Sequence, residues 1–141
     1  MLNMIWPILM VVGANTVYNI TTKSTPAEVN SFASLAISYL VAAAGSAALF
    51  FATSQNKNII SELSKTNWTA YVLGFAVIAL EFGYICIYRA GWKVSVASLV
   101  ANITLACVLL IVGLILYREA LSLRQIIGMI VCAAGLVLIA K

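Results

Sequence analysis

Long apolar runs separated by short polar connectors limit what this chain can fold into. The runs cover about 2–21, 30–52, 68–88, 94–117 and 125–140. A helix needs roughly 20 mostly apolar residues to cross a hydrocarbon core of about 30 Å. Because the runs use almost all of the 141 residues, we expect an all-α integral membrane protein with five transmembrane helices in one domain, 1–141.

The composition narrows the classes of function. Hydrophobic residues make up 64% of the chain and charged residues 9%, which leaves no soluble catalytic domain, and no nucleophile with a base is visible, so we expect no enzyme. Cys86, Cys107 and Cys132 lie singly in apolar runs and histidine is absent, so we expect no metal and no cofactor. We expect a multi-pass protein of the plasma (inner) membrane with no nucleic-acid partner.

Lysine and arginine are balanced between the two sides that five crossings would define. One side carries Lys57, Lys65, Arg118 and Arg124, and the other Lys23, Arg89, Lys93 and Lys141. Since these residues prefer the cytoplasm, the balance predicts insertion in both directions. Two opposed copies would form an antiparallel homodimer of ten helices, like the inverted repeats of transporters. If Arg89 lies too near its helix end to count, one orientation is weakly preferred.

One carboxylate, Glu81, lies deep in an apolar run, whereas the other three lie in connectors. At a rise of 1.5 Å per residue it lies about 5 Å from the bilayer centre. An acid at that depth costs several kcal/mol unless it faces a cavity or a partner, so we expect a proton or cation site. The alternative is a hydrogen bond to Asn102 or Asn15 that only fixes packing.

Other polar side chains at membrane depth complete the expected site. Tyr84 and Tyr88 follow Glu81 at i+3 and i+7 and share its helix face. Each remaining polar group alone would make a hydrogen bond between helices, but together they would line one chamber. The expected solute and proton site comprises Glu81, Tyr84, Tyr88, Asn102, Asn15, Tyr18 and Ser98. Phenol faces attract cations, which favours a cationic or aromatic solute; a neutral metabolite remains an alternative.

Three segments carry a resemblance to a known family: AGWKVSVAS at 90–98, YREALS at 117–122 and QIIGMIVCAAG at 125–135. They resemble the C-terminal part of an EamA-like repeat of the drug/metabolite transporter superfamily; the N-terminal half fits by helix count and by Lys23 before Pro26. The resemblance implies a single-repeat member that pairs as an antiparallel dimer. The last run is similar to the last helix of the small multidrug resistance family, which implies a dimer contact at Gly128, Cys132 and Gly135.

The chain departs from these families at two places. The small multidrug resistance carboxylate lies in the first helix, where this chain has Asn15 and Asn19, and run 94–117 lacks the proline of many EamA-like repeats. Glu119 matches a recurring acid that we interpret as fixing a turn. We therefore expect a secondary transporter of a small organic solute, working by alternating access with proton coupling through Glu81. The alternative is an accessory subunit or half of a heterodimeric lipid-carrier flippase.

Overall fold

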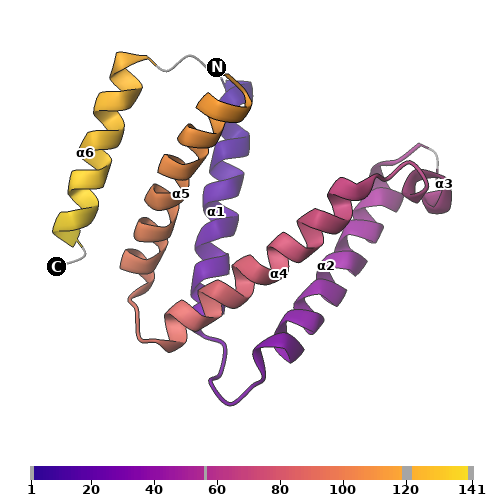
Figure 1. Ribbon diagram of the computed structural model, residues 1–141. Helices are drawn as coiled ribbons and strands as arrows, with labels where there is room; N and C mark the ends of the chain where they lie inside the picture. The colour runs from indigo at the N-terminus through magenta and orange to yellow at the C-terminus, as the bar shows by residue number, and fades with distance from the viewer. Residues whose placement is uncertain (1, 56, 119–121, 140–141) are drawn as a thin grey trace. The chain divides into compact units, whose positions relative to one another are not determined.

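The computed structural model describes residues 2–55, 57–118 and 122–139, and its regular structure there is entirely helical. The helices are α1 (Leu2–Lys23), α2 (Ser31–Thr53), α3 (Ile59–Leu63), α4 (Trp68–Arg89), α5 (Val94–Leu116) and α6 (Leu123–Ile139), shown in Figure 1. The five long helices occupy the five apolar runs of the sequence. The chain divides into two compact units, Met1–Thr21 with Ala90–Lys141, and Thr22–Arg89.

Three of the described helices, α2, α4 and α5, are long and apolar enough to cross a membrane. Large apolar side chains on them are exposed, including Leu40 at 71%, Phe75 at 76% and Leu116 at 73%. An apolar surface of this kind requires lipid or other helices as its surroundings. The protein is therefore a helical membrane protein.

The remaining two long helices differ from these three in different ways. The second half of α1 carries amide and hydroxyl side chains, among them Asn15, Thr16 and Asn19, although its 22 residues extend over about 33 Å. Helix α6 has only 17 residues, or about 26 Å, and holds a shorter apolar stretch, Leu123–Gly135. A helix of that length spans a bilayer with local thinning or with flanking side chains that reach to the interface.

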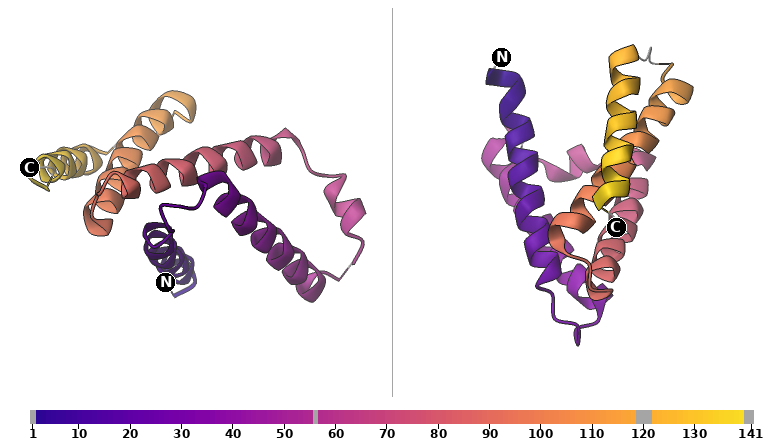
Figure 2. Two further views of the ribbon diagram at one scale, coloured as in Figure 1. Left: turned by 90° about the horizontal axis from the view of Figure 1, so that it is seen from below. Right: turned by 90° about the vertical axis from the view of Figure 1, so that its left-hand side faces the viewer.

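The first unit contains most of α1 together with α5 and α6. Helices α5 and α6 are in contact and lie side by side, joined by the connector that follows Leu116 (Figures 1 and 2). Two small side chains in this unit are almost fully covered: Asn19 is 3% exposed and Ala97 is 2% exposed. Small residues at contacts allow helix backbones to approach closely in lipid.

The second unit is built on α2 and α4, which contact each other. Asn30 is the N-cap of α2: its side-chain oxygen accepts hydrogen bonds from the backbone N–H groups of Phe32 and Ala33 at 2.9 and 3.4 Å. The rings of Phe32 on α2 and Phe82 on α4 stack with their centroids 4.8 Å apart. A stacked pair of this kind contributes about 1 kcal/mol of stabilisation beyond that of the apolar area it buries. The pair joins the start of α2 to the second half of α4.

Two cations join the segment from Lys23 to Val29, which leads from the last residue of α1 to α2, to the end of α4. The Lys23 ammonium donates to the backbone carbonyl oxygen of Tyr88 at 3.2 Å. The Arg89 guanidinium donates from Nη2 to the carbonyl oxygens of Val29 at 2.6 Å and Pro26 at 3.4 Å. Carbonyl groups at the end of a helix have no partner within it, and cations stabilise that end. These bonds therefore fix where α4 ends against the turn.

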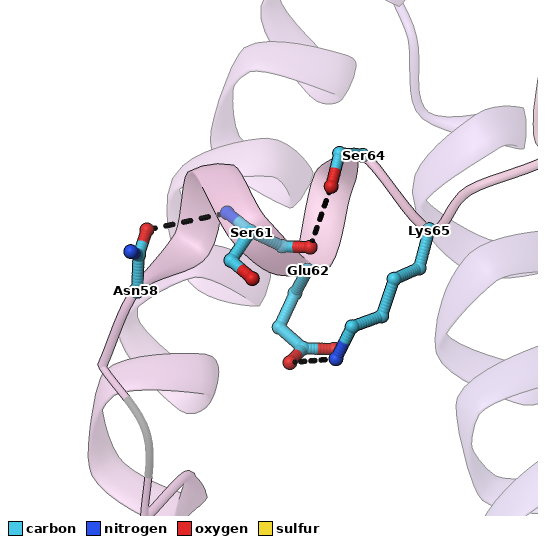
Figure 3. Close-up of polar contacts among 5 residues, drawn as sticks. All are labelled: Asn58, Ser61, Glu62, Ser64 and Lys65. Atoms are coloured by element: carbon cyan, nitrogen blue, oxygen red, sulfur yellow. Dashed lines mark hydrogen bonds and ion pairs between the residues drawn. The ribbon is translucent and has the colours of Figure 1, made fainter.

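Helix α3 is a single turn in the longest polar connector. Its first residues are held by Asn58, whose side-chain oxygen accepts from the Ser61 N–H at 3.2 Å (Figure 3). At its end the Ser64 hydroxyl donates to the Ser61 carbonyl oxygen at 2.9 Å, and Lys65 forms an ion pair with Glu62 at 2.6 Å. These contacts are local and exposed, and we assign them a structural role in shaping the connector.

Candidate functional site

A groove of about 680 Å³ lies between α1 and α5 in the first unit. Its lining combines amide and hydroxyl side chains with aliphatic ones. The lining residues are Val12, Asn15, Thr16, Asn19 and Ile20 of α1, and Val94, Ser95, Ser98, Leu99 and Asn102 of α5. None of the ten is charged. A cavity of this volume is within the range that holds a small organic molecule.

The polar side chains of the groove are organised by hydrogen bonds within each helix. On α1, the Asn19 amide donates to the carbonyl oxygen of Asn15 at 2.7 Å and to its side-chain oxygen at 2.8 Å. On α5, the Asn102 amide donates to the carbonyl oxygen of Ser98 at 2.7 Å and to its hydroxyl at 3.3 Å. These bonds keep each side chain in one orientation, so the groove presents a fixed pattern of donors and acceptors.

A second polar group lies in the other unit, around Glu81 on α4. The hydroxyl of Tyr39, from α2, lies near the Glu81 carboxylate. The Tyr39 hydroxyl is buried and makes no hydrogen bond to a described residue, and Glu81 is partly buried. The helix contact between α2 and α4 therefore gives the intramembrane acid a phenol partner that can donate to it.

Two further phenols follow Glu81 along α4. The rings of Tyr84 and Tyr88 lie with their centroids 6.1 Å apart and tilted by 33°. The Lys23 ammonium stands 5.7 Å from the centroid of the Tyr88 ring, within the range of a cation–π contact. Tyr88 is thus held at the end of α4 by a cation of the protein itself.

The structure divides the predicted site residues between the two units. Asn15, Ser98 and Asn102 line the groove, whereas Tyr18, on the same helix as Asn15, does not. Glu81, Tyr84 and Tyr88 belong to the second unit. The hydrogen bonds of Asn15 and Asn102 run within their own helices.

The expected solute and proton site left out four residues that the structure places at these two sites, although Asn19 and Tyr39 were recognisable from the sequence as polar groups at membrane depth. Thr16, Asn19 and Ser95 line the groove, and helical spacing was a usable signal for them: Asn19 follows Asn15 by four residues, and Ser95 precedes Ser98 by three. No local signal marks Tyr39 as the partner of Glu81, because the two residues meet only through the pairing of α2 with α4.

The glycines of α6 that were expected at a dimer contact lie on an open face. A Cβ atom added at Gly128 or Gly135 would meet no heavy atom within 4 Å, and Cys132, between them on the helix, is exposed with a free thiol. Glu119, the acid in the turn after α5, lies outside the residues that the structure describes.

Apolar helices of membrane-spanning length, together with an uncharged polar groove between two helices, are the features of a membrane transport protein. The comparison with family models agrees with this class. The model of the EamA-like transporter family matches residues 4–141, and the chain belongs to this family. The predicted resemblance to the drug/metabolite transporter superfamily is thereby confirmed. No curated protein and no solved structure matches the chain.

Proposed function

We propose that the protein is a secondary transporter that moves a small organic solute across the plasma membrane by alternating access. The observation that carries this proposal is the groove between α1 and α5, which has room for a small molecule and a fixed set of polar groups. Family membership supports transport of small solutes as the general activity. Alternating access requires such a site near the middle of a helical bundle.

Proton coupling is assigned to Glu81. An intramembrane carboxylate marks an ion or proton pathway by default, and the phenol of Tyr39 beside it gives the proton a neighbouring hydrogen-bonding group. In this scheme the Glu81 carboxyl group binds a proton on one side of the membrane and releases it on the other. The resulting change in its charge favours one orientation of the solute site over the other. Tyr84 and Tyr88 extend the polar face of the same helix.

The transporting unit is proposed to be an antiparallel homodimer in which α1, α2, α4, α5 and α6 of each copy cross the bilayer. The balanced lysine and arginine count supports insertion in both directions. The open Gly128 and Gly135 face of α6 supports close approach of a second helix. The rival proposal is an accessory subunit or half of a heterodimeric lipid-carrier flippase, which requires one fixed orientation.

The test is uptake into liposomes that contain only this protein. An inward proton gradient is imposed, and a panel of labelled amino acids, sugars, nucleosides and aromatic ammonium compounds is offered. We expect accumulation of at least one class above protein-free liposomes, and loss of that accumulation with a protonophore. If folded, reconstituted protein accumulates no member of the panel, then the proposal of a self-sufficient transporter is wrong and the rival is favoured.

A further inference from the structure

The polar side chains of the groove between α1 and α5 indicate what kind of ligand fits there, because some of their hydrogen-bond donors and acceptors have no partner among the residues that the structure describes. The side-chain oxygen of Asn15 already accepts from Asn19, and the amide nitrogen of Asn102 already donates to Ser98. On these two asparagines the amide N–H pair of Asn15 and the side-chain oxygen of Asn102 remain, and beside them the hydroxyl groups of Ser95 and Ser98 can still donate. Neither of the two asparagine groups has a hydrogen bond to any described residue of the chain. Among the amides, one helix therefore offers a donor and the other offers an acceptor.

With α1 and α5 crossing the bilayer, as the proposed function has them, the amide N–H pair of Asn15 and the side-chain oxygen of Asn102 lie where hydrogen bonds to water are scarce. Asn15 precedes Lys23, the last residue of α1, by eight positions, and Asn102 follows Val94, the first residue of α5, by eight. At 1.5 Å per residue each lies about 12 Å from that end of its helix. A polar group at this depth costs free energy unless it is paired, so a solute that supplies both complementary groups gains from binding there.

The lack of charged side chains in the groove lining restricts the class of solute further. All ten lining residues are uncharged, and aliphatic side chains, among them Val12, Ile20 and Leu99, complete its walls. A cation or an anion moved to this depth loses its hydration and finds no opposite charge on the lining. An uncharged polar group carries a much smaller desolvation cost, which two hydrogen bonds offset.

We infer that the α1–α5 groove binds an uncharged solute that carries a hydrogen-bond acceptor next to a donor, as a primary amide does, attached to an apolar body. The acceptor receives the amide N–H of Asn15, the donor gives to the side-chain oxygen of Asn102, and the body contacts Val12, Ile20 and Leu99. This inference rests on the proposed function and narrows its solute from the cationic class to the uncharged class, with an aromatic body still allowed.

The test compares three probes that share one ring and differ in charge: benzamide, benzoate and benzamidinium. Their binding to the purified full chain in lipid nanodiscs is measured by equilibrium dialysis at alkaline pH. We expect saturable binding of benzamide, with an affinity at least about tenfold higher than that of either ion. The reason is that burying an unpaired charge at this depth lowers the binding affinity by more than about tenfold. The ratio between probes is the readout, so a change in the amount of active protein does not affect it.

The variant Asn102→Asp replaces the free amide oxygen with a carboxylate of the same shape. It should shift the ratio toward benzamidinium by about tenfold or more, because the cation then gains a charged partner. Asn67→Asp is the matched control: Asn67 lies in the connector before α4, and its side-chain oxygen accepts from the Thr69 N–H, which an aspartate also does. The control should keep the wild-type ratio.

Three results would overturn the inference. They are tighter binding of either ion by the wild type, no saturable benzamide binding up to its solubility limit, and an equal shift of the ratio in both aspartate variants. Any of these results combined with proton-driven uptake of another solute rejects the solute class and leaves the transport function standing. Absence of uptake together with selective benzamide binding rejects transport and leaves the binding site.

Discussion

The ammonium of Lys23 lies 3.2 Å from the backbone carbonyl oxygen of Tyr88 and 5.7 Å from the centre of its ring, although 65 residues separate the two in sequence. The contact joins the chain leaving α1 to the last turn of α4. It uses a cation at the position where a helix end carries unsatisfied carbonyl groups. Lys23 therefore has a structural role, in addition to being one of the cations whose distribution between the two sides predicts the orientation of insertion.

Removing this cation should loosen the turn. Lys23→Met keeps much of the apolar stem but loses the ammonium. We expect a lower midpoint of thermal unfolding, corresponding to about 1 kcal/mol, since solvent exposure of Lys23 reduces what a hydrogen bond to a charged group contributes. The measurement is a thermal melt of the purified protein in detergent. Lys57→Met, in the polar connector after α2, is the control. Equal midpoints for the two variants would show that the Lys23 contact does not stabilise the fold.

Neutralising the intramembrane acid should remove the response to pH. Glu81→Gln keeps the shape of the side chain and can still accept a hydrogen bond from Tyr39, but it cannot exchange a proton. We expect solute exchange by this variant to be independent of pH and uptake driven by a proton gradient to be lost. Glu62→Gln, which removes a carboxylate ion-paired to Lys65 outside the spans, should behave as the wild type. An unchanged pH profile for Glu81→Gln would falsify the coupling role.

The phenol of Tyr39 should change the pH at which Glu81 couples uptake to protons, without being required for the coupling itself. Tyr39→Phe removes the hydroxyl near Glu81 and leaves the ring in place. We expect proton-driven uptake to persist with its pH profile displaced along the pH axis, because the phenol can donate to the carboxylate and favours its charged form. Tyr71→Phe, on an exposed phenol of α4, is the matched control. A profile that stays in place argues against this contact.

Filling the groove should block the solute. Ser98→Phe places a ring in the space between α1 and α5, and we expect uptake to fall by about tenfold or more because the site is then occluded. Ser38→Phe is matched in chemistry and lies on an exposed position of α2. Both variants should reconstitute to the same level. Normal uptake by Ser98→Phe would place the solute elsewhere in the protein.

Enlarging the glycine face should separate the proposed dimer. Gly128→Leu and Gly135→Leu add side chains where a second helix would approach, so we expect the dimer fraction in light scattering of the detergent-solubilised protein to fall. A single chain has room for the change, since a Cβ at either position meets nothing within 4 Å. Gly74→Leu on α4 has equal room and is the control. A dimer that survives both α6 variants uses another face.

Several features of the fold follow from the sequence alone. The long helices are predictable because lipid offers no partners to backbone N–H and C=O groups, so each apolar run must satisfy them internally. The depth of Glu81 follows from helical rise, and the shared face of Ser98 and Asn102 follows from helical periodicity. The family could also be predicted, from short segments in the last third of the chain.

Only the tertiary structure decided which faces meet. It placed Tyr39 beside Glu81, set Asn15 and Asn102 across one groove, and brought Lys23 to the end of α4. None of these pairings has a local signal, because uniformly apolar helices carry little amphipathic pattern to orient them and lipid does not distinguish one apolar face from another. Helix formation is a property of neighbouring residues, whereas the choice of contact depends on how side chains distant in sequence fit together.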